Sequence, residues 1–174
     1  QTFRDNLDNI EQPVIVDVAA SEAPYTKITF CPELERFGLT ELTDDIVILF
    51  KKRVYDAAGW CTGVNVFLND ERIAIRDFNQ YTNLYLGPKN NGRKRVYCRV
   101  NDRWEICATV SDDNEFQQVS MVNGIVTSNG GRHIDHVANK IANRLSKQIS
   151  TDKNQVSPKV IKSNLWVLTR TSIE

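Results

Sequence analysis

The stretch FQQVSMVNGIVTSNGGRHIDHV, residues 116–137, constrains the fold more than any other part of the chain, because a strand-like pattern ends there and a helical pattern begins. Residues 116–128 are rich in β-branched and apolar side chains, as strands are. Beyond Gly130 and Gly131, apolar residues recur at spacings of three and four, namely Ile134, Val137, Ala138, Ile141, Leu145 and Ile149. The stretch predicts a strand with a bulge or close approach at Gly124, a turn that only glycine can make, and an amphipathic helix.

A short hairpin is predicted before this stretch. The runs VNVFL (64–68) and RIAIR (72–76) flank Asn69, Asp70 and Glu71, which are typical turn residues. Further towards the N-terminus, the alternating run YTKITF (25–30) predicts a half-buried strand.

A second hairpin is predicted from RVYCRV (95–100) and WEICATV (104–110), which flank Asn101, Asp102 and Arg103. Alternation puts one set of side chains on one face of each strand: Val96, Cys98 and Val100, and Trp104, Ile106 and Ala108.

A helix is predicted over residues 43–59. Thr43 can accept a hydrogen bond from a first-turn amide, and Asp44 and Asp45 suit the positive end of the helix dipole. Gly59 can end the helix in a left-handed conformation. The predicted apolar face consists of Ile46, Leu49, Phe50, Val54 and Ala57.

The C-terminal part predicts two more elements. Ser157 and Pro158 are typical of the cap and first residue of a short helix, and residues 164–174 predict a closing strand. Strands followed by helices predict an α+β fold, with helices on one face of a mostly antiparallel sheet.

Charge is balanced over the whole chain but not along it. The 22 basic and 22 acidic side chains sum to zero, which on average disfavours a nucleic-acid partner. Residues 1–59 carry 6 basic and 11 acidic side chains, whereas residues 138–172 carry 7 basic side chains and only Asp152. The C-terminal third is therefore able to face a polyanion, although two parts of a larger charge-balanced assembly would show the same gradient.

The four cysteines, Cys31, Cys61, Cys98 and Cys107, lack C-x-x-C spacing. Because the chain shows neither a signal-like N-terminus nor a run of 18 apolar residues, they are predicted to be reduced thiols of a cytosolic or nuclear protein. Their irregular spacing disfavours a zinc site. Since no methionine opens the chain, we expect it to be a piece of a longer protein.

Two ligand sites are considered at the Gly-Gly turn, and both are disfavoured. A glycine pair before a helix can offer free amides to a phosphate, but the spacing fits neither G-x-G-x-x-G nor G-x-x-x-x-G-K-[ST]. His133 and His136 flank Asp135 at a spacing that could share a metal, but no third ligand or carboxylate base accompanies them. We therefore predict no metal site and no catalytic residue in this chain.

Two basic segments are candidates for phosphate contact. The run KNNGRKR (89–95) packs four cations into seven residues, and a solvated loop is its favoured interpretation. Lys147, Lys153 and Lys159 surround a predicted loop with few acids and are the predicted DNA-binding residues.

Longer motifs occur together and in one order: QTFRDN, YTKITFCPELERFGL, RVYDAAG, NVFLN, NDRWEICATVSD, FQQVSMVNGIVTSNGGRHIDHVANKI and IKSNLWV. They resemble the eukaryotic type IIA DNA topoisomerases, the topoisomerase II family, over nearly the whole chain. The stretch FQQVSMVNGIVTSNGGRH resembles the family signature FQQ-x-S-x-VN-x-I-x-T-x-x-GG-x-H, of which bacterial gyrase B carries a related form.

The resemblance implies two domains. Residues 1–78 are similar to the C-terminal part of a GHKL ATPase domain. Residues 79–174 are similar to a transducer domain of the ribosomal-protein type with a left-handed βαβ unit, ending before the Q-T-K loop that carries the family's switch lysine. The family's residues for ATP and Mg have no counterpart here, so this segment alone is expected to bind neither and to be inactive.

The function implied by the resemblance is that of an ATP-dependent, homodimeric, nuclear enzyme that passes one DNA duplex through a transient double-strand break. This segment would couple ATP binding and hydrolysis to closure of the N-terminal gate and to the DNA-cleavage core. Gly130, Gly131 and His133 would hold the shape of the coupling unit. Lys147, Lys153 and Lys159 occupy the place of the family's lysine-rich DNA-contact loop, spread more widely than a compact lysine run. Double-stranded DNA and a second copy are the implied partners, and no membrane is implied.

Two other functions stay open at this point. A noncatalytic nucleic-acid-binding module of the same fold predicts that residues 138–172 bind duplex DNA with a steep salt dependence. The matching region of another GHKL ATPase is the second alternative, and the FQQ and GG-x-H motifs argue against it.

Overall fold

The computed structural model describes residues 1–19 and 23–174. It divides into two compact units, Gln1–Glu41 and Leu42–Glu174. This division does not test the predicted domain boundary at residue 78, since residues 42–78 simply pack with the strands that follow them. That boundary concerns which known domain each part resembles, and it stays a prediction.

Regular structure is sparse in the first unit. The antiparallel pair β1 (Phe3–Arg4) and β2 (Asn9–Ile10) encloses the 3₁₀ helix η1 (Asp5–Leu7). A second 3₁₀ helix, η2 (Leu34–Phe37), ends at Gly38, whose φ of 69° is left-handed.

The predicted strand over residues 25–30 is wrong. The backbone there forms no ladder with any described segment, and Tyr25, Ile28 and Phe30 are 82%, 83% and 72% exposed. Alternation marks a segment that can be a strand, but its N–H and C=O groups need a partner strand to form one.

The second unit begins with helix α1 (Asp44–Trp60). Asp44 and Asp45 lie in its first turn as predicted, but the Thr43 side chain makes no capping hydrogen bond. The predicted apolar face is wrong in its first half, because Leu49 and Phe50 remain 46% and 45% exposed. Only the C-terminal half of α1 reaches the core of this unit, through Val54, Ala58 and Trp60.

Gly59 does not end α1, contrary to the prediction. It lies within the helix, where a Cβ atom would come within 2.5 Å of the Tyr81 ring. The glycine is therefore required by close packing against Tyr81 and not by a left-handed conformation. Trp60 continues the helix to a C-cap at Cys61.

The predicted hairpin after α1 is confirmed with shorter strands. Strands β3 (Phe67–Leu68) and β4 (Glu71–Arg72) are joined by Asn69 and Asp70, whose φ values of 49° and 65° are those of a primed hairpin turn. Two short helices follow, α2 (Phe78–Tyr81) and α3 (Asn83–Leu86).

A five-stranded sheet forms the centre of the second unit, in the order β5-β6-β9-β7-β8. Its strands are β5 (Arg95–Asn101), β6 (Trp104–Val110), β7 (Gln117–Val122), β8 (Ile125–Val126) and β9 (Leu165–Thr171). All pairs are antiparallel except β7 with β9. The predicted mostly antiparallel sheet is confirmed, and the pairing of Val96 with Ala108 and Cys98 with Ile106 confirms the predicted faces of the second hairpin.

The predicted strand over residues 116–128 is instead a hairpin of β7 and β8. Asn123 and Gly124 turn the chain with φ values of 49° and 83°. A Cβ atom at Gly124 would lie 3.6 Å from the Trp60 indole nitrogen. Gly124 is thus a close-approach point, as predicted, but it lies in a turn.

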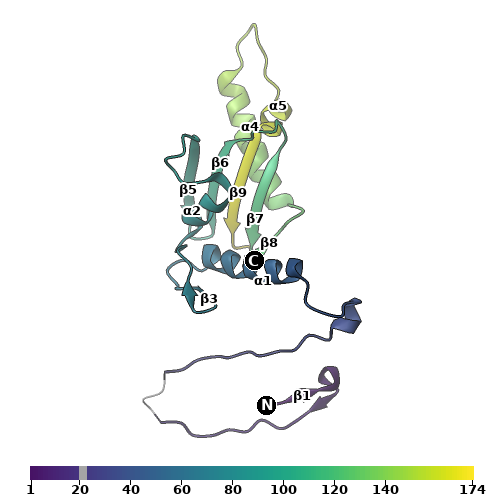
Figure 1. The fold of residues 1–174 in the computed structure, drawn as a ribbon. Coiled ribbons are helices and arrows are strands. Elements are labelled where there is room, and N and C mark those ends of the chain that lie inside the picture. Colours follow the sequence, from purple (N-terminus) through teal and green to yellow (C-terminus); the bar gives the residue numbers. More distant parts are fainter. Residues whose placement is uncertain (20–22) are drawn as a thin grey trace. The chain divides into compact units, whose positions relative to one another are not determined.

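Helix α4 (Arg132–Ile149) and helix α5 (Pro158–Ser163) connect β7 and β8 to β9. Figure 1 shows α4 behind the sheet, with β9 to the left of β7 and both strands running downward, so the βαβ crossover is left-handed, as the resemblance implied. The Ser157 hydroxyl caps α5 by accepting from the amide of Val160 at 3.3 Å, which confirms the predicted cap.

The sheet separates two hydrophobic cores. On the α4 side the core contains Ile134, Val137, Ala138, Ala142, Ile161, Leu165 and Val167. On the other side, residues of α1, α2 and α3 pack on Cys107, Met121 and Leu168. The predicted layer of helices on one face is therefore present, and the opposite face carries a second helical layer.

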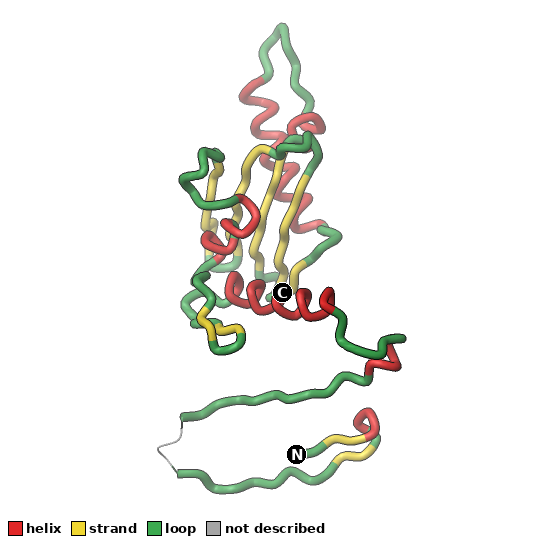
Figure 2. The backbone as a smooth tube through the Cα atoms, viewed as in Figure 1, coloured by secondary structure: helices red, strands yellow, loops and turns green. Residues whose placement is uncertain are grey.

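The two ends of this sheet differ in what surrounds them (Figure 2). We call one the α1 end: it holds the β5–β6 and β7–β8 turns, the start of α4 and the last residues of β9. The other is the loop end, which holds residues 87–94, the β6–β7 connection and residues 150–157. The candidate functional residues lie at these two ends.

Candidate functional site

The turn between β8 and α4, at the α1 end of the sheet, is made by the two predicted glycines. Gly130 and Gly131 have φ values of 72° and 149°, which side chains other than glycine rarely adopt. The amide of Gly130 donates to the Thr127 carbonyl at 2.9 Å. Gly131 is the N-cap residue of α4, so the prediction of a turn that only glycine can make is confirmed.

His133 lies in the first turn of α4 and faces back towards β8. Its Nε2 atom is 3.2 Å from the Thr127 hydroxyl. Burial lowers the pKa of His133 below its ordinary value, and the nearby Asp135 opposes that shift in part. The hydrogen bond between the start of α4 and Thr127 therefore fits a neutral imidazole.

Two residues of β7 complete this corner, and the sequence did not identify them. The Gln118 side chain donates to the carbonyls of Thr127 and Ser128 at 3.2 Å and 2.9 Å. The Ser120 hydroxyl, fully buried, donates to Gln118 at 2.7 Å. Strand β7, the turn and α4 are thus held together by polar contacts.

The histidines do not form a joint site. His133 contacts Thr127, whereas His136 lines a groove with Val100 and Trp104. Over residues 1–19 and 23–174, no three side chains of His, Cys, Asp or Glu gather as metal ligands would.

A second polar cluster at the α1 end centres on Arg170, near the end of β9. Its guanidinium Nη1 donates to Glu105 of β6 at 2.9 Å, and its Nε donates to the Trp60 carbonyl at 3.1 Å. The guanidinium also lies 4.5 Å from the centre of the Trp60 ring. With side chains only 14% and 6% exposed, Arg170 and Glu105 form a largely buried ion pair.

Glu105 also binds β5, because it accepts a hydrogen bond from the Tyr97 hydroxyl. Burial, together with this bond, raises the pKa of Tyr97, so the phenol stays protonated and donates. We call Trp60, Tyr97, Glu105 and Arg170 the α1–sheet cluster. It joins α1 to three neighbouring strands, and the sequence did not predict it.

A third contact fixes the chain beyond β9 to the β7–β8 turn. The Asn123 side chain donates to the Ile173 carbonyl at 2.8 Å and accepts from the Ile173 amide at 2.9 Å. The Asn123 amide donates to the Thr171 carbonyl at 3.0 Å.

Helices α1 and α2 are joined by a buried carboxylate. Asp56, whose side chain is 4% exposed, accepts from the Tyr81 hydroxyl at 2.7 Å and from Lys52 at 2.8 Å. The Tyr81 hydroxyl also lies 2.9 Å from that of Tyr85. Burial is the main cause that raises the pKa of Tyr81. The C-terminal half of α1 is therefore bound to the sheet on one side and to α2 on another.

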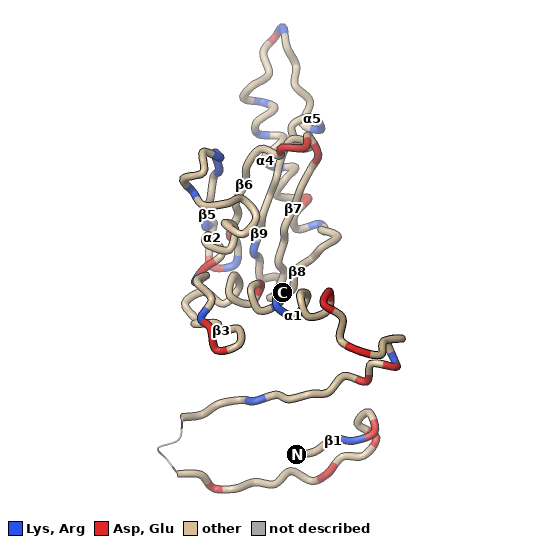
Figure 3. Tube along the Cα trace, viewed as in Figure 1, with Lys and Arg blue, Asp and Glu red and all other residues tan. Residues whose placement is uncertain are grey.

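The predicted DNA-binding lysines lie at the loop end. Lys147 is in the last turn of α4, Lys153 in the connection to α5, and Lys159 in α5, and all three are exposed. The connection is shaped by Ser146, which donates to the Val156 carbonyl at 2.7 Å. Figure 3 shows basic residues along α4, at the tip of the connection and on α5.

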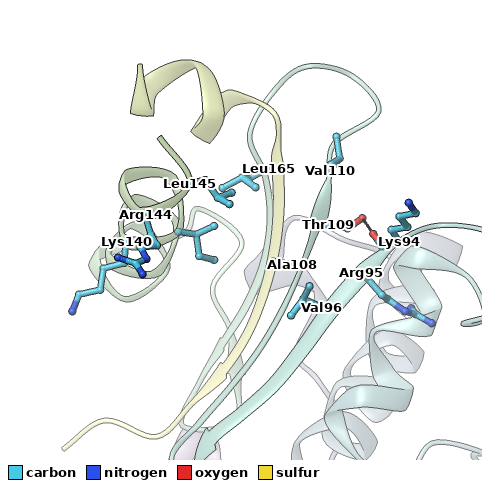
Figure 4. Close-up of a pocket in the computed structure, with 11 residues that line it drawn as sticks. Lys94, Arg95, Val96, Ala108, Thr109, Val110, Lys140, Arg144, Leu145 and Leu165 are labelled. Carbon is cyan, nitrogen blue, oxygen red and sulfur yellow. Dashed lines mark hydrogen bonds between the residues drawn. The ribbon is translucent and has the colours of Figure 1, made fainter. Parts of the chain in front are cut away.

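An apolar groove runs between α4 and the β5–β6 hairpin (Figure 4). It consists of two hollows of about 590 and 420 Å³ that share Lys140 and Ile141. Val96 and Val100 are 71% and 57% exposed in it, so the α4 side of β5 is not covered by the described residues. The groove was not predicted, since alternation shows that a face is apolar but not what lies against it.

The four cysteines are free thiols, and Cys107 alone among them is buried. Burial raises the pKa of the Cys107 thiol, which keeps it protonated. Among the described residues, no helix is long and apolar enough to cross a membrane.

The chain is similar to known proteins in both sequence and structure. The family model for DNA gyrase B matches residues 71–174. The whole chain is 43% identical to a probable DNA topoisomerase 2 of Dictyostelium discoideum and 40% identical to DNA topoisomerase 2 of Arabidopsis thaliana. It spans 12% of the length of each of these relatives.

Two solved structures are similar over 80% of this chain, each with a TM-score of 0.70. One is the ATPase region of Saccharomyces cerevisiae topoisomerase II, at 37% identity, of which 36% is covered. The other contains the ATPase and transducer domains of DNA topoisomerase II from Balamuthia mandrillaris, at 29% identity, of which 35% is covered. Because the family model matches more than half of the residues, the chain belongs to the DNA gyrase B family, and it is similar to the ATPase and transducer region of type II DNA topoisomerases.

Proposed function

We propose that this chain is part of an ATP-dependent type II DNA topoisomerase, an enzyme that passes one duplex through a transient break in another. Its similarity along the whole chain to eukaryotic DNA topoisomerase 2 supports this assignment. The proposed enzyme is a nuclear homodimer that uses ATP and Mg. This segment couples the nucleotide state to closure of the N-terminal gate and to the DNA-cleavage core.

The main support for the coupling role is the α1–sheet cluster. By resemblance, α1 is the final helix of the GHKL domain, and the sheet belongs to the transducer. Arg170 binds the α1 carboxyl end through Trp60 and the centre of the sheet through Glu105. A force on α1 therefore reaches β9 through buried contacts, without passing through a flexible loop.

Rigid-body transfer of this kind requires that the transmitting part does not deform. The sheet, α4 and the corner at Gly130, Gly131 and His133 meet that requirement, because β7 holds the corner through Gln118 and Ser120. Interfaces of packed elements switch between discrete arrangements and do not deform continuously. In this proposal the corner keeps α4 in one orientation relative to the sheet while the unit moves.

The described residues do not fit ATP or Mg by themselves. They include no group of three or more potential metal-ligating side chains, and the sequence lacks both glycine-rich phosphate-binding patterns. No step of the reaction is therefore assigned to residues of this segment. Its contribution is positional.

The loop end supplies the proposed contact with DNA. Lys147, Lys153 and Lys159 are exposed on consecutive elements, where ammonium groups can neutralise backbone phosphates. Contacts of this kind hold a duplex without reading its sequence.

The coupling role is tested in the full-length protein with Arg170→Lys. Lysine keeps the positive charge but loses the planar guanidinium that reaches Glu105 and the Trp60 carbonyl together and stacks on the indole. We expect DNA passages per ATP hydrolysed to fall, while the apparent affinity for ATP stays near that of the unchanged protein. The matched control is Arg99→Lys, since Arg99 lies on β5 in an exposed pair with Asp102.

Three outcomes decide between the proposal and its rivals. An unchanged ratio of passages to ATP in Arg170→Lys removes the coupling role. A full-length protein that hydrolyses ATP but never passes duplex DNA refutes the topoisomerase assignment and favours another GHKL ATPase. A protein that binds duplex DNA but neither hydrolyses ATP nor passes DNA favours the noncatalytic binding module.

A further inference from the structure

The loop before β5 forms a strongly cationic pocket. The pocket has a volume of about 510 Å³ and is lined by Lys89, Arg93, Lys94, Arg95 and Tyr97. Four of these five side chains are cations, and no carboxylate lines the pocket. Such a concentration of like charge is unfavourable unless an anion accompanies it.

The two arginines of the pocket are held in place by the surrounding structure. Arg95 donates through Nη1 to the Gly87 carbonyl at 3.1 Å and through Nη2 to the Asn83 side chain at 2.8 Å. Arg93 pairs with Asp112, and its guanidinium lies 5.4 Å from the centre of the Trp166 ring. Because these contacts restrict both guanidinium groups to small rotations, neither loses much side-chain entropy when it binds a ligand.

Each arginine keeps one nitrogen without an acceptor. Within the described part of the chain, Arg93 Nη1 and Arg95 Nε are buried and have no hydrogen-bond partner. A buried donor of a charged group that stays unpaired costs free energy. Both belong to side chains that line the pocket, so an oxyanion entering it, with a small rotation of either guanidinium, would supply acceptors.

The loop that carries these residues has a defined shape. The Asn91 side chain donates to the Leu86 carbonyl at 2.7 Å and accepts from the Arg93 amide at 3.0 Å. A Cβ atom at Gly87, where φ is 73°, would lie 2.4 Å from the Asn91 amide nitrogen. Because Gly87 has no side chain, the Asn91 side chain can pack against it and close the loop onto Leu86. This contact sets the direction in which the chain enters β5.

We infer that this pocket is an oxyanion site that takes a phosphate group of a duplex DNA backbone. Guanidinium forks and ammonium groups together are suited to a phosphate oxyanion. The pocket lies at the loop end of the sheet, as do Lys147, Lys153 and Lys159, so one duplex could meet both (Figure 3). The choice of DNA as the source of the phosphate rests on the proposed function, whereas the oxyanion site itself rests on the pocket.

The test uses the full-length protein and two probes, inorganic pyrophosphate and a short duplex. The variant is Lys89→Gln with Lys94→Gln, because both side chains are exposed and their loss leaves the arginine contacts in place. The matched control is Lys27→Gln with Lys51→Gln, which removes the same charge from exposed positions outside the pocket. Binding is measured by calorimetry for pyrophosphate and by anisotropy for the duplex, each over a range of salt concentrations.

We expect the variant to bind pyrophosphate about three- to tenfold more weakly than the control, as the loss of two exposed ion pairs implies. For the duplex, the slope of log affinity against log salt should become shallower by up to about 0.9, the value for one phosphate that is no longer neutralised. If variant and control bind pyrophosphate equally, there is no oxyanion site. If only pyrophosphate binding changes, the site takes a free phosphate compound and the DNA backbone is excluded as its ligand.

This design also separates the inference from the proposed function. Duplex binding that is weaker and less salt-dependent in the variant than in the control, in a protein that passes DNA, supports both. Pyrophosphate binding by a protein that neither passes nor binds DNA supports the oxyanion site and refutes the proposed function.

Discussion

The two ends of the central sheet differ in whether their charged side chains are buried and paired or exposed. At the α1 end, charged and polar side chains are largely buried and hydrogen-bonded to one another: Arg170 and Tyr97 both bind Glu105, and His133 contacts Thr127. At the loop end, Lys147, Lys153, Lys159 and the cations of the 89–95 loop are mostly exposed, and within the described part of the chain Arg93 alone among them forms an ion pair, with Asp112. The α1 end is therefore suited to holding elements in a fixed geometry, and the loop end to binding an anion.

In the function proposed above, the two ends have separate parts of one task. Buried pairs are poor contributors to net stability, but breaking one partner is costly, so they hold elements in one relative position. Exposed cations cost little to maintain and act over a Debye length of about 8 Å in physiological salt. A coupling unit needs the first kind of contact where it is moved and the second where it touches DNA.

The largest expected effect is at the α1 end, from Arg170→Met. The variant leaves Glu105 charged and buried without its partner, so we expect the free energy of unfolding to fall by about 3–5 kcal/mol. Denaturant unfolding of the 174-residue chain, followed by tryptophan fluorescence, measures it.

A second substitution separates the effect of the broken pair from that of the missing side chain. Glu105→Gln added to Arg170→Met removes the unpaired charge but still accepts from Tyr97, so most of the stability should return. Arg99→Met is the matched control at an exposed pair and should stay within about 0.5 kcal/mol. A decrease in Arg170→Met no greater than that in the control would show that the α1 end is not held by its buried pair.

The next effect is expected from Gly131→Ala, also at the α1 end. Its φ of 149° and ψ of −179° are accessible almost only to glycine, and a Cβ atom would meet the His133 ring at 3.1 Å. We expect a decrease of about 1–3 kcal/mol in the free energy of unfolding.

Gly92→Ala is the comparison at the loop end. Gly92 also has a positive φ, 85°, but nothing lies within 4 Å of an added Cβ atom. The cost there should be about 1 kcal/mol, from the backbone alone. If both variants are destabilised equally, the close approach of an added Cβ atom to the His133 ring costs nothing beyond the backbone effect.

Sequence patterns predict helices and strands whose apolar side chains recur periodically. They do not predict contacts between residues that lie far apart in the chain. The stripe on α4 and the alternation of β5 and β6 are periodic, and the structure confirms both, except at Ile149 in the last turn of α4, which is 52% exposed. The α1–sheet cluster joins residues 60, 97, 105 and 170, which lie in four separate elements, so no local pattern marks it. Only the β6–β9 register, which pairs Glu105 with Arg170, makes the cluster visible.

The wrong predictions have the same origin. Gly59 near the end of a helical pattern is typical of a cap, yet its actual constraint is the Tyr81 ring, 22 positions away in sequence. The run at 25–30 alternates correctly but has no partner strand among the described residues. For the candidate site, the Gly130–Gly131 turn and the three lysines are predictable from residue type, whereas Gln118, Ser120 and Arg170 acquire their roles from tertiary pairing.

A smaller effect is expected at the loop end from Lys147→Gln, Lys153→Gln and Lys159→Gln combined. Each lysine that neutralises a phosphate releases a counterion, so the slope of log affinity against log salt should become shallower by about 0.9 for each phosphate that is no longer neutralised. The stability of the fold should change little, because all three side chains are exposed.

Duplex binding of the full-length protein, measured between low and physiological salt, checks this. The matched control removes three exposed cations from other elements: Lys27→Gln, Lys51→Gln and Arg76→Gln. An equal change in slope for the two triple variants would mean that overall charge, and not the loop end, attracts the duplex.

The smallest expected effect is a pH dependence at the α1 end, from His133. Burial lowers the pKa of its imidazole in the folded chain below the ordinary value of 6.5, despite the opposing effect of Asp135. Well above pH 6.5 the imidazole is neutral in both the folded and the unfolded chain, so protonation of His133 does not change the free energy of unfolding. As the pH falls through 6.5 towards the folded pKa, the unfolded chain takes up a proton that the folded chain does not, so stability decreases.

We therefore expect the free energy of unfolding to fall between pH 7.5 and 5.5, and His133→Gln to remove part of that fall, since glutamine can still bond Thr127 but does not titrate. His136→Gln is the matched control, because it removes an imidazole from the same helix at an exposed position outside the corner. Denaturant unfolding at the two pH values gives the difference. The opposite result would be a pH dependence that disappears in His136→Gln and persists in His133→Gln. It would place the titrating group in the groove beside Trp104. The α1 end would then be held by Arg170 and the glycines, with no contribution from a neutral His133.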